Sequence, residues 1–90
     1  MGIEPFEKRA HHVIVFELVG ELSNVETIAA NLSIRENTDL KARYGGRRWR
    51  KRKGTGLARL ANGSLRNAEF HWYEAHGVGR RKMKVKRLLD

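Results

Sequence analysis

The sequence predicts an α+β fold in which helices cover one face of a C-terminal three-stranded antiparallel meander. Three observations predict it: a β-branched run near the N-terminus, two helix-capping signatures in the middle, and an Asn-Gly turn between apolar segments further on. The chain has 90 residues, of which 40% are hydrophobic. This size and composition suit one small basic domain, so we expect residues 1–90 to share a single core.

The first predicted element is a strand over residues 11–19, which are rich in β-branched and aromatic side chains and end at Gly20. A helix is expected next, because Ser23 and Glu26 match a capping box. The apolar residues that follow recur at helical spacing: Val25, Ile28, Ala29 and Leu32.

A second capping signature starts at Ser33 and includes Glu36. It predicts a second helix, or a bent continuation of the first, that ends at Tyr44 before Gly45-Gly46. The apolar face of this segment is thin, so the sequence leaves open whether the second helix forms.

The C-terminal half predicts the meander. Segments 57–60 and 65–73 flank a turn at 61–64, where Asn-Gly favours a tight hairpin because both residues tolerate positive φ. A second glycine-containing turn over 75–79 leads to a final strand over 81–89, in which polar and apolar residues alternate.

The net charge of +9 is distributed unevenly along the chain. Residues 1–40 carry three basic and seven acidic side chains, whereas residues 41–90 carry sixteen basic and three acidic ones. The acidic half can neutralise only part of the basic half. We therefore expect a cationic surface for an anionic partner, with nucleic acid, either RNA or DNA, as the first choice.

A dense basic run before Gly54 predicts a cationic loop that contacts phosphates. The aromatic residue within the run has two interpretations, stacking on an unpaired base or packing into the core. The run consists of Arg47, Arg48, Trp49, Arg50, Lys51, Arg52 and Lys53.

Further cations lie on the last predicted strand and the turn before it. Period-two alternation places the three lysines on one open face of the sheet, with the apolar residues between them facing the helices. Such lysines extend a phosphate-binding track, or serve only to block pairing between sheets. The predicted contact residues here are Arg80, Arg81, Lys82, Lys84 and Lys86.

An alternative interpretation of the same region is an endoribonuclease. Alternation separates Phe70 and Trp72 from His71 and Tyr73, although a one-residue slip in register would exchange the two pairs. A histidine, a phenol and a carboxylate near cations could cleave RNA by general acid–base catalysis. The candidate catalytic residues are His71, Tyr73, Glu74, His76, Arg80 and Arg81.

The composition argues against several other classes. The chain has no cysteine, so disulfides, thiolate zinc sites and iron–sulfur clusters are excluded. His11, His12, His71 and His76 lack metal-ligand spacing, and we expect neither a metal nor a cofactor. The N-terminal residues lack a cleavable leader pattern and the longest apolar run, 13–16, is too short to span a bilayer, so a cytoplasmic location without a membrane partner is expected.

The C-terminal half also resembles small basic bacterial proteins that have no established activity. The residues that carry this resemblance are Trp49-Arg50-Lys51, Asn62-Gly63, the block 69–79 with its His-Trp-Tyr-Glu-Ala-His-Gly stretch, and Lys84-Val85-Lys86-Arg87. It implies a bacterial origin and no mechanism. A looser likeness, in element order and charge, is to the RelE and ParE toxin superfamily. Its members are small and basic, with an N-terminal strand, two helices and a meander, and no functional position of theirs can be matched to a residue here.

The leading hypothesis is a non-enzymatic nucleic-acid-binding domain, with RNA ahead of DNA, because the sheet offers cations and aromatic side chains while no helix is strongly basic. The alternatives are a toxin-like endoribonuclease and an adaptor that binds an acidic protein or forms a homodimer. The enzyme is less favoured than the binding domain.

Overall fold

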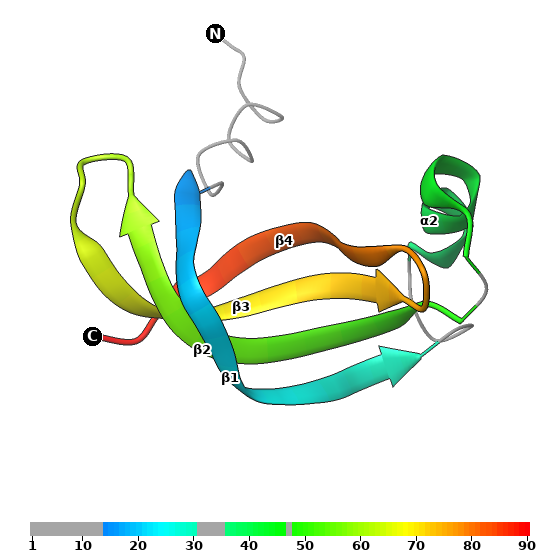
Figure 1. Ribbon diagram of the computed structural model, residues 1–90, viewed down its shortest axis with the longest axis horizontal. Helices are drawn as coiled ribbons and strands as arrows, with labels where there is room; N and C mark the ends of the chain where they lie inside the picture. The colour runs from blue at the N-terminus through cyan, green and yellow to red at the C-terminus, as the bar shows by residue number, and fades with distance from the viewer. Residues whose placement is uncertain (1–13, 31–35, 47) are drawn as a thin grey trace, which may run out of the picture.

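Four strands form one antiparallel sheet in the computed structural model, which describes residues 14–30, 36–46 and 48–90. The strands are β1 (Phe16–Ala30), β2 (Arg50–Leu60), β3 (Leu65–Ala75) and β4 (Gly79–Leu88), and they lie side by side in chain order (Figure 1). Within these ranges there is one short helix, α2 (Asn37–Tyr44). The prediction of a three-stranded meander with helices on one face is therefore wrong, because the described chain is mostly β and has a fourth strand.

The extra strand length comes from the segment predicted as the first helix. Residues up to Ala30 continue β1 and pair with β2, for example Glu26 with Lys53 and Thr27 with Arg52. The residues of the expected capping box form an irregular stretch instead, in which Asn24 has φ 52°. Residues 25, 27 and 28 are β-branched and have low helix propensity, so the helical spacing of the apolar residues is a weak signal here. Strand pairing with β2 is the stronger effect. Residues 11–13 and Leu32 lie outside the described residues.

The strand–helix–helix order behind the likeness to RelE and ParE is not the order of the described chain, since 23–30 is strand. The second helix does form, from Asn37 to Tyr44, while Ser33 lies outside the described residues. The helix ends before Gly45 as predicted, but the cap is not the left-handed helical one, since Gly45 has φ 76° and ψ −149° and its N–H donates to the carbonyl of Lys41 at 3.0 Å.

The hairpin between β2 and β3 lies where Asn62-Gly63 predicts it. The turn type differs, because only Gly63 has positive φ (87°). The N–H of Gly63 donates to the carbonyl of Leu60, and the N–H of Leu60 donates to that of Ser64. This is a three-residue loop with glycine at the left-handed position, a common hairpin with a bulge.

Most of the basic run belongs to a central strand. Residues 50–53 pair with β1 on one side and with β3 on the other. The prediction of a cationic loop is wrong for these residues, because a segment between two strands satisfies its backbone hydrogen bonds in both directions. Only Arg48 and Trp49 precede the strand, and Arg47 lies outside the described residues.

The alternation of β3 gives the sheet two faces, which we name by their residues. The Phe70 face carries Ala68, Phe70 and Trp72, and the Tyr73 face carries His71, Tyr73 and Ala75. The predicted separation of these side chains is confirmed. The expected position of the helix is wrong, because α2 packs through Leu40 on the Tyr73 face rather than over Phe70.

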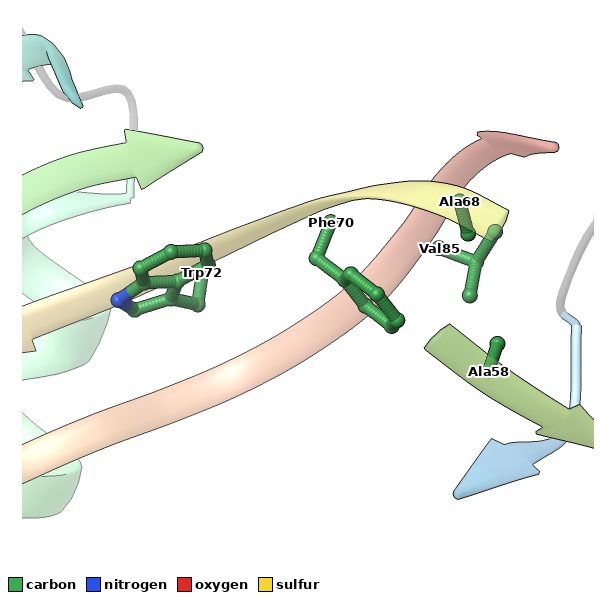
Figure 2. Packing of buried hydrophobic residues seen from close by; sticks show 5 residues of the cluster. All are labelled: Ala58, Ala68, Phe70, Trp72 and Val85. Atoms are coloured by element: carbon green, nitrogen blue, oxygen red, sulfur yellow. The ribbon is translucent and has the colours of Figure 1, made fainter. Parts of the chain in front are cut away.

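The larger core cluster lies on the Phe70 face. Phe70 lies with Ala68, Ala58 and Val85, while Trp72 lies further along β3 (Figure 2). Apolar residues of β1 and β4 pack against the same cluster, so the two outer strands contribute to one core. The concentration of buried side chains on β3 follows from its position between two strands.

Strand β1 bends sharply partway along its length (Figure 1). The bend coincides with Gly20 at φ 79° and with register shifts on either side of Ser23. Opposite it, β2 has Gly54, where a Cβ atom would lie 3.1 Å from the Ser23 carbonyl oxygen and 3.2 Å from the Trp72 ring. The glycine thus lets β1 approach β2 closely and pack onto Trp72.

Candidate nucleic-acid interface

The basic residues of β2 and β4 flank the C-terminal half of β3 in rows across the sheet. Lys51, Tyr73 and Arg81 form one row by strand pairing, and Lys53, His71 and Lys84 form the next. Residues in register share a face. The Tyr73 face therefore brings together cations that are far apart in the sequence.

Carboxylates of α2 neutralise part of this charge. The ammonium group of Lys82 lies 2.6 Å from Glu36 Oε1 and 2.7 Å from Asp39 Oδ2. The Lys82 hydrogen bonds lower the pKa of both carboxyls, and the bonds to Asp39 and Glu36 raise the pKa of Lys82. Lys82 is thus a structural link between β4 and α2, and its charge is balanced before any ligand binds.

The predicted track of Lys82, Lys84 and Lys86 on an open face is wrong in two respects. The helix lies on the same face as the lysines. Two register shifts also interrupt the period-two alternation of β4, one between Arg81 and Lys84 and one at Lys86. Lys82 itself has φ 55°. Each extra residue in β4 shifts the following side chains to the opposite face of the sheet. The polar and apolar alternation of the sequence does not indicate where such bulges occur.

Trp49, the aromatic residue of the basic run, is buried, and so is Tyr73 of β3, another aromatic residue near the cations. Trp49 is 0% exposed and its Nε1–H donates to the carbonyl of Gly45 at 2.7 Å. Tyr73 is 6% exposed and its hydroxyl donates to Glu36 Oε2 at 3.1 Å. The core interpretation of Trp49 is confirmed, and neither ring is accessible to a base.

His71 is held within the sheet. Its Nε2 lies 2.7 Å from Glu69 Oε2, and Glu69 also contacts Arg87. The His71 hydrogen bond lowers the pKa of Glu69. The other ring nitrogen, Nδ1, is buried and has no hydrogen-bond partner in the described part of the chain. A substrate could not reach this nitrogen without local rearrangement.

The six candidate catalytic residues do not converge. His71 and Tyr73 lie on one face, whereas Glu74 and Arg80 lie opposite each other on the other. His76 is exposed in the turn between β3 and β4. No common point is close to a histidine, a free carboxylate and both arginines.

On the Phe70 face, three arginines lie on the same part of the sheet as Glu74, and Glu21 lines the pocket beside it. Glu74 is the register partner of both Arg50 and Arg80, and its Oε2 lies 3.6 Å from Arg52 Nη1. Its Oε1 accepts a hydrogen bond of 2.9 Å from Trp72 Nε1. Three arginines against the carboxylates of Glu74 and Glu21 leave an excess of positive charge at this end of the sheet.

A group of exposed cations makes no ion pair with a carboxylate among residues 14–30, 36–46 and 48–90, although the charge of Lys84 helps to lower the pKa of Glu36. We call five of them the cationic edge: three lie along the edge strand β4, and two lie just before or at the start of β2, which β3 separates from β4. The cationic edge consists of Arg48, Arg50, Arg80, Lys84 and Lys86. Between Arg80 and Lys86 the strand extends about 20 Å.

Other predicted contact residues take internal roles. Lys53 pairs with Glu26 at 3.7 Å and Arg52 pairs with Glu74. The ammonium group of Lys51 lies 5.8 Å from the Tyr73 ring centre, and Arg81 lies 5.4 Å from the Tyr44 ring centre. These cations add to the local potential but are less available to a ligand than those of the cationic edge.

Sequence reasoning missed the carboxylates that select which cations remain available. Glu36, Asp39 and Glu69 perform this role. The acidic character of the first forty residues is the signal for Glu36 and Asp39, and no sequence signal indicates Glu69. Sequence reasoning also missed a pocket of about 450 Å³ on the Phe70 face, because residues 20–25 were assigned to a helix and its capping segment.

No cluster of histidine and carboxylate side chains that could hold a metal ion occurs in the part of the chain that the structure describes. In that same part, no helix is long and apolar enough to cross a membrane.

Comparisons of the chain with known protein families, with curated proteins and with solved structures find no match. The site must therefore be interpreted from its own geometry.

Proposed function

We propose that this domain binds single-stranded RNA through the cationic edge. The observation that carries the proposal is the separation of the cations into two groups. Some cations make ion pairs with carboxylates, as Lys82 does with Glu36 and Asp39, whereas Arg48, Arg50, Arg80, Lys84 and Lys86 are exposed and make no ion pair within the described residues.

Cations along an edge strand are better placed to contact the phosphates of a single strand than to read bases in the groove of duplex DNA. Proteins that read duplex DNA place a helix or a two-stranded ribbon in the major groove. The helix of the described chain has eight residues and packs on the sheet through Leu40. Cations spaced along a strand can follow a flexible backbone, and counterion release then supplies most of the affinity.

The competing role for these lysines is to prevent β4 from pairing with another sheet. The two roles differ in what happens when the charge is removed. A binding surface loses affinity for RNA, whereas a purely protective edge leaves RNA affinity unchanged and promotes self-association.

The experiment compares the wild-type protein with a Lys84→Gln/Lys86→Gln variant in fluorescence titrations against a labelled single-stranded RNA. Each lost phosphate contact reduces the slope of log affinity against log salt by about 0.7, so the double variant should lose about 1.4. The matched control is Lys41→Gln/Arg59→Gln, which removes the same charge from α2 and from the other end of β2. Its slope should remain near that of the wild type.

Equal slopes for the two double variants would contradict the proposal, because they would show that only net charge matters. Loss of solubility or a new oligomer in the Lys84→Gln/Lys86→Gln variant, with unchanged RNA affinity, would assign β4 to edge protection. Binding of an acidic protein or of a second copy without any RNA affinity would favour an adaptor.

A further inference from the structure

A pocket of about 450 Å³ opens on the Phe70 face between the bent part of β1 and the start of β4. Leu22 and Val25 of β1 contribute apolar surface and Glu21 of the same strand contributes a carboxylate, while Trp72 and Glu74 come from β3 and Arg80 comes from β4. The volume lies in the range of small-ligand sites. Neither the binding of phosphates along β4 nor the packing of the core requires a pocket here.

The carboxylate of Glu74 is fixed in position within this pocket. Trp72 Nε1 donates to one oxygen at 2.9 Å, and Arg52 lies 3.6 Å from the other. The side chain nevertheless keeps 27% of its surface exposed. A carboxylate has about four lone-pair positions, so it can accept further hydrogen bonds from a ligand.

These residues define what a ligand must offer. Glu74 accepts hydrogen bonds and cannot donate them, so the ligand must present N–H groups. Leu22 and Val25 favour an apolar ring surface beside it. Arg80, the register partner of Glu74 on the same face, favours a neighbouring phosphate. A nucleobase attached to its phosphate satisfies all three requirements.

The carboxylate also distinguishes between bases. Guanine carries two adjacent donors, N1–H and the N2 amino group, which two carboxylate oxygens can accept together. Uracil carries one N–H between two carbonyl oxygens, which a carboxylate repels. Good bidentate contacts to a base edge typically discriminate by about ten-fold or more.

We propose that the pocket receives one unpaired guanine of the bound strand, with Glu74 accepting hydrogen bonds from the base edge and Arg80 contacting the adjacent phosphate. The inference rests on the proposed RNA binding and adds a base preference to it. It places specificity in the pocket and general affinity in the cationic edge.

The first test uses nucleotides and needs no variant. The chain has two tryptophans, so its ¹H–¹⁵N spectrum contains two indole N–H signals, from Trp49 and Trp72. Titration with GMP should shift the Trp72 signal, whose N–H bonds to Glu74, and leave that of Trp49, whose N–H bonds to Gly45. UMP should bind at least about ten-fold more weakly. Equal shifts of both signals, or no shift at Trp72, would overturn the proposal.

The second test compares two RNA hexamers, six uridines and the same strand with one central guanosine. The wild-type protein should prefer the guanosine strand about ten-fold. Glu74→Gln should remove the preference, since an amide presents one acceptor and one donor group. Glu26→Gln, which removes the same charge from an exposed residue of β1, should retain it.

The outcomes separate the two proposals. Salt-dependent binding of both hexamers with equal affinity would overturn the guanine pocket and leave the cationic edge intact. Absence of hexamer binding, together with a GMP-induced shift at Trp72, would support the pocket chemistry and contradict the RNA-binding function.

Discussion

Replacement of Gly54 by alanine should destabilise the domain, because the methyl group would meet atoms that cannot easily move. Its Cβ would lie 3.1 Å from the Ser23 carbonyl oxygen, 3.1 Å from Val25 Cγ2 and 3.2 Å from Trp72 Cη2. The first of these is backbone and the last belongs to a buried indole ring. Insertion of a methyl group into such a site costs about 1–3 kcal/mol.

Part of this cost is offset, since alanine in a strand is better than glycine by about 0.5–1 kcal/mol. We therefore expect a net loss of about 1 kcal/mol, and at most about 2.5 kcal/mol, in the free energy of unfolding. For a domain of this size a loss of about 1 kcal/mol lowers the melting temperature by about 4–8 °C. Thermal unfolding followed by circular dichroism, with urea unfolding as a second measurement, provides the assay.

Gly56→Ala is the matched control, two residues further along β2 on the same face. Its Cβ would lie 3.3 Å from methyl groups of Leu18 and Leu22 and 3.4 Å from the Phe70 ring. Leucine side-chain ends can shift by a few tenths of an ångström, so we expect a change within about 1 kcal/mol of zero. A Gly54→Ala protein as stable as the wild type, or more stable than Gly56→Ala, would refute the close approach of β1 to Trp72.

Two further predictions concern the Tyr73 face. Trp49→Phe should lower the free energy of unfolding by about 1–3 kcal/mol, because it removes the hydrogen bond to the Gly45 carbonyl and leaves buried space. The RNA affinity of this variant should stay within about two-fold of the wild type, since the ring is buried. A larger loss of affinity would support stacking of Trp49 on a base. Lys82→Gln should cost less than about 1 kcal/mol near neutral pH, because the ion pairs are partly exposed. The difference in stability between this variant and the wild type should shrink at low pH, as the carboxyls protonate at pKa values lowered below 4.5 for Glu36 and below 3.8 for Asp39. It should also shrink at high pH, as Lys82 loses its proton at a pKa raised above 10.5. Urea unfolding across pH checks the sign, and a difference that grows at either extreme would contradict the assignment.

Local turn chemistry was predictable from the sequence. The hairpin at Asn62-Gly63 and the helix end at Gly45 both depend on residues within a few positions of each other. The alternation of β3 was also predictable, because a strand between two others keeps a regular register with β2. These features need no knowledge of distant contacts.

The fate of residues 23–30 was not predictable in this way. Their apolar residues fit a helical period, yet pairing with the basic half of β2 makes them a strand. The basic residues of β2 meet one carboxylate of this segment, in the contact of Glu26 with Lys53. Tertiary contact of this kind overrides local propensity, and no local pattern reports it.

The available cations of the candidate site were predictable only in part. The sequence identified the basic half but could not separate Lys82, which Glu36 and Asp39 neutralise, from Lys84, which no described carboxylate contacts. That distinction depends on where α2 packs and on the bulges of β4. The Glu74 pocket depends in turn on the bend of β1.

The most direct test of the central claim is the salt dependence of wild-type binding to a single-stranded RNA. If the five cations of the cationic edge each contact a phosphate, log affinity should fall against log salt with a slope of about −3.5, an affinity loss of about 130-fold between 50 and 200 mM. The RNA should remain uncut on a denaturing gel. No binding at low salt, or binding with a slope near zero, would contradict the assignment of this surface to RNA.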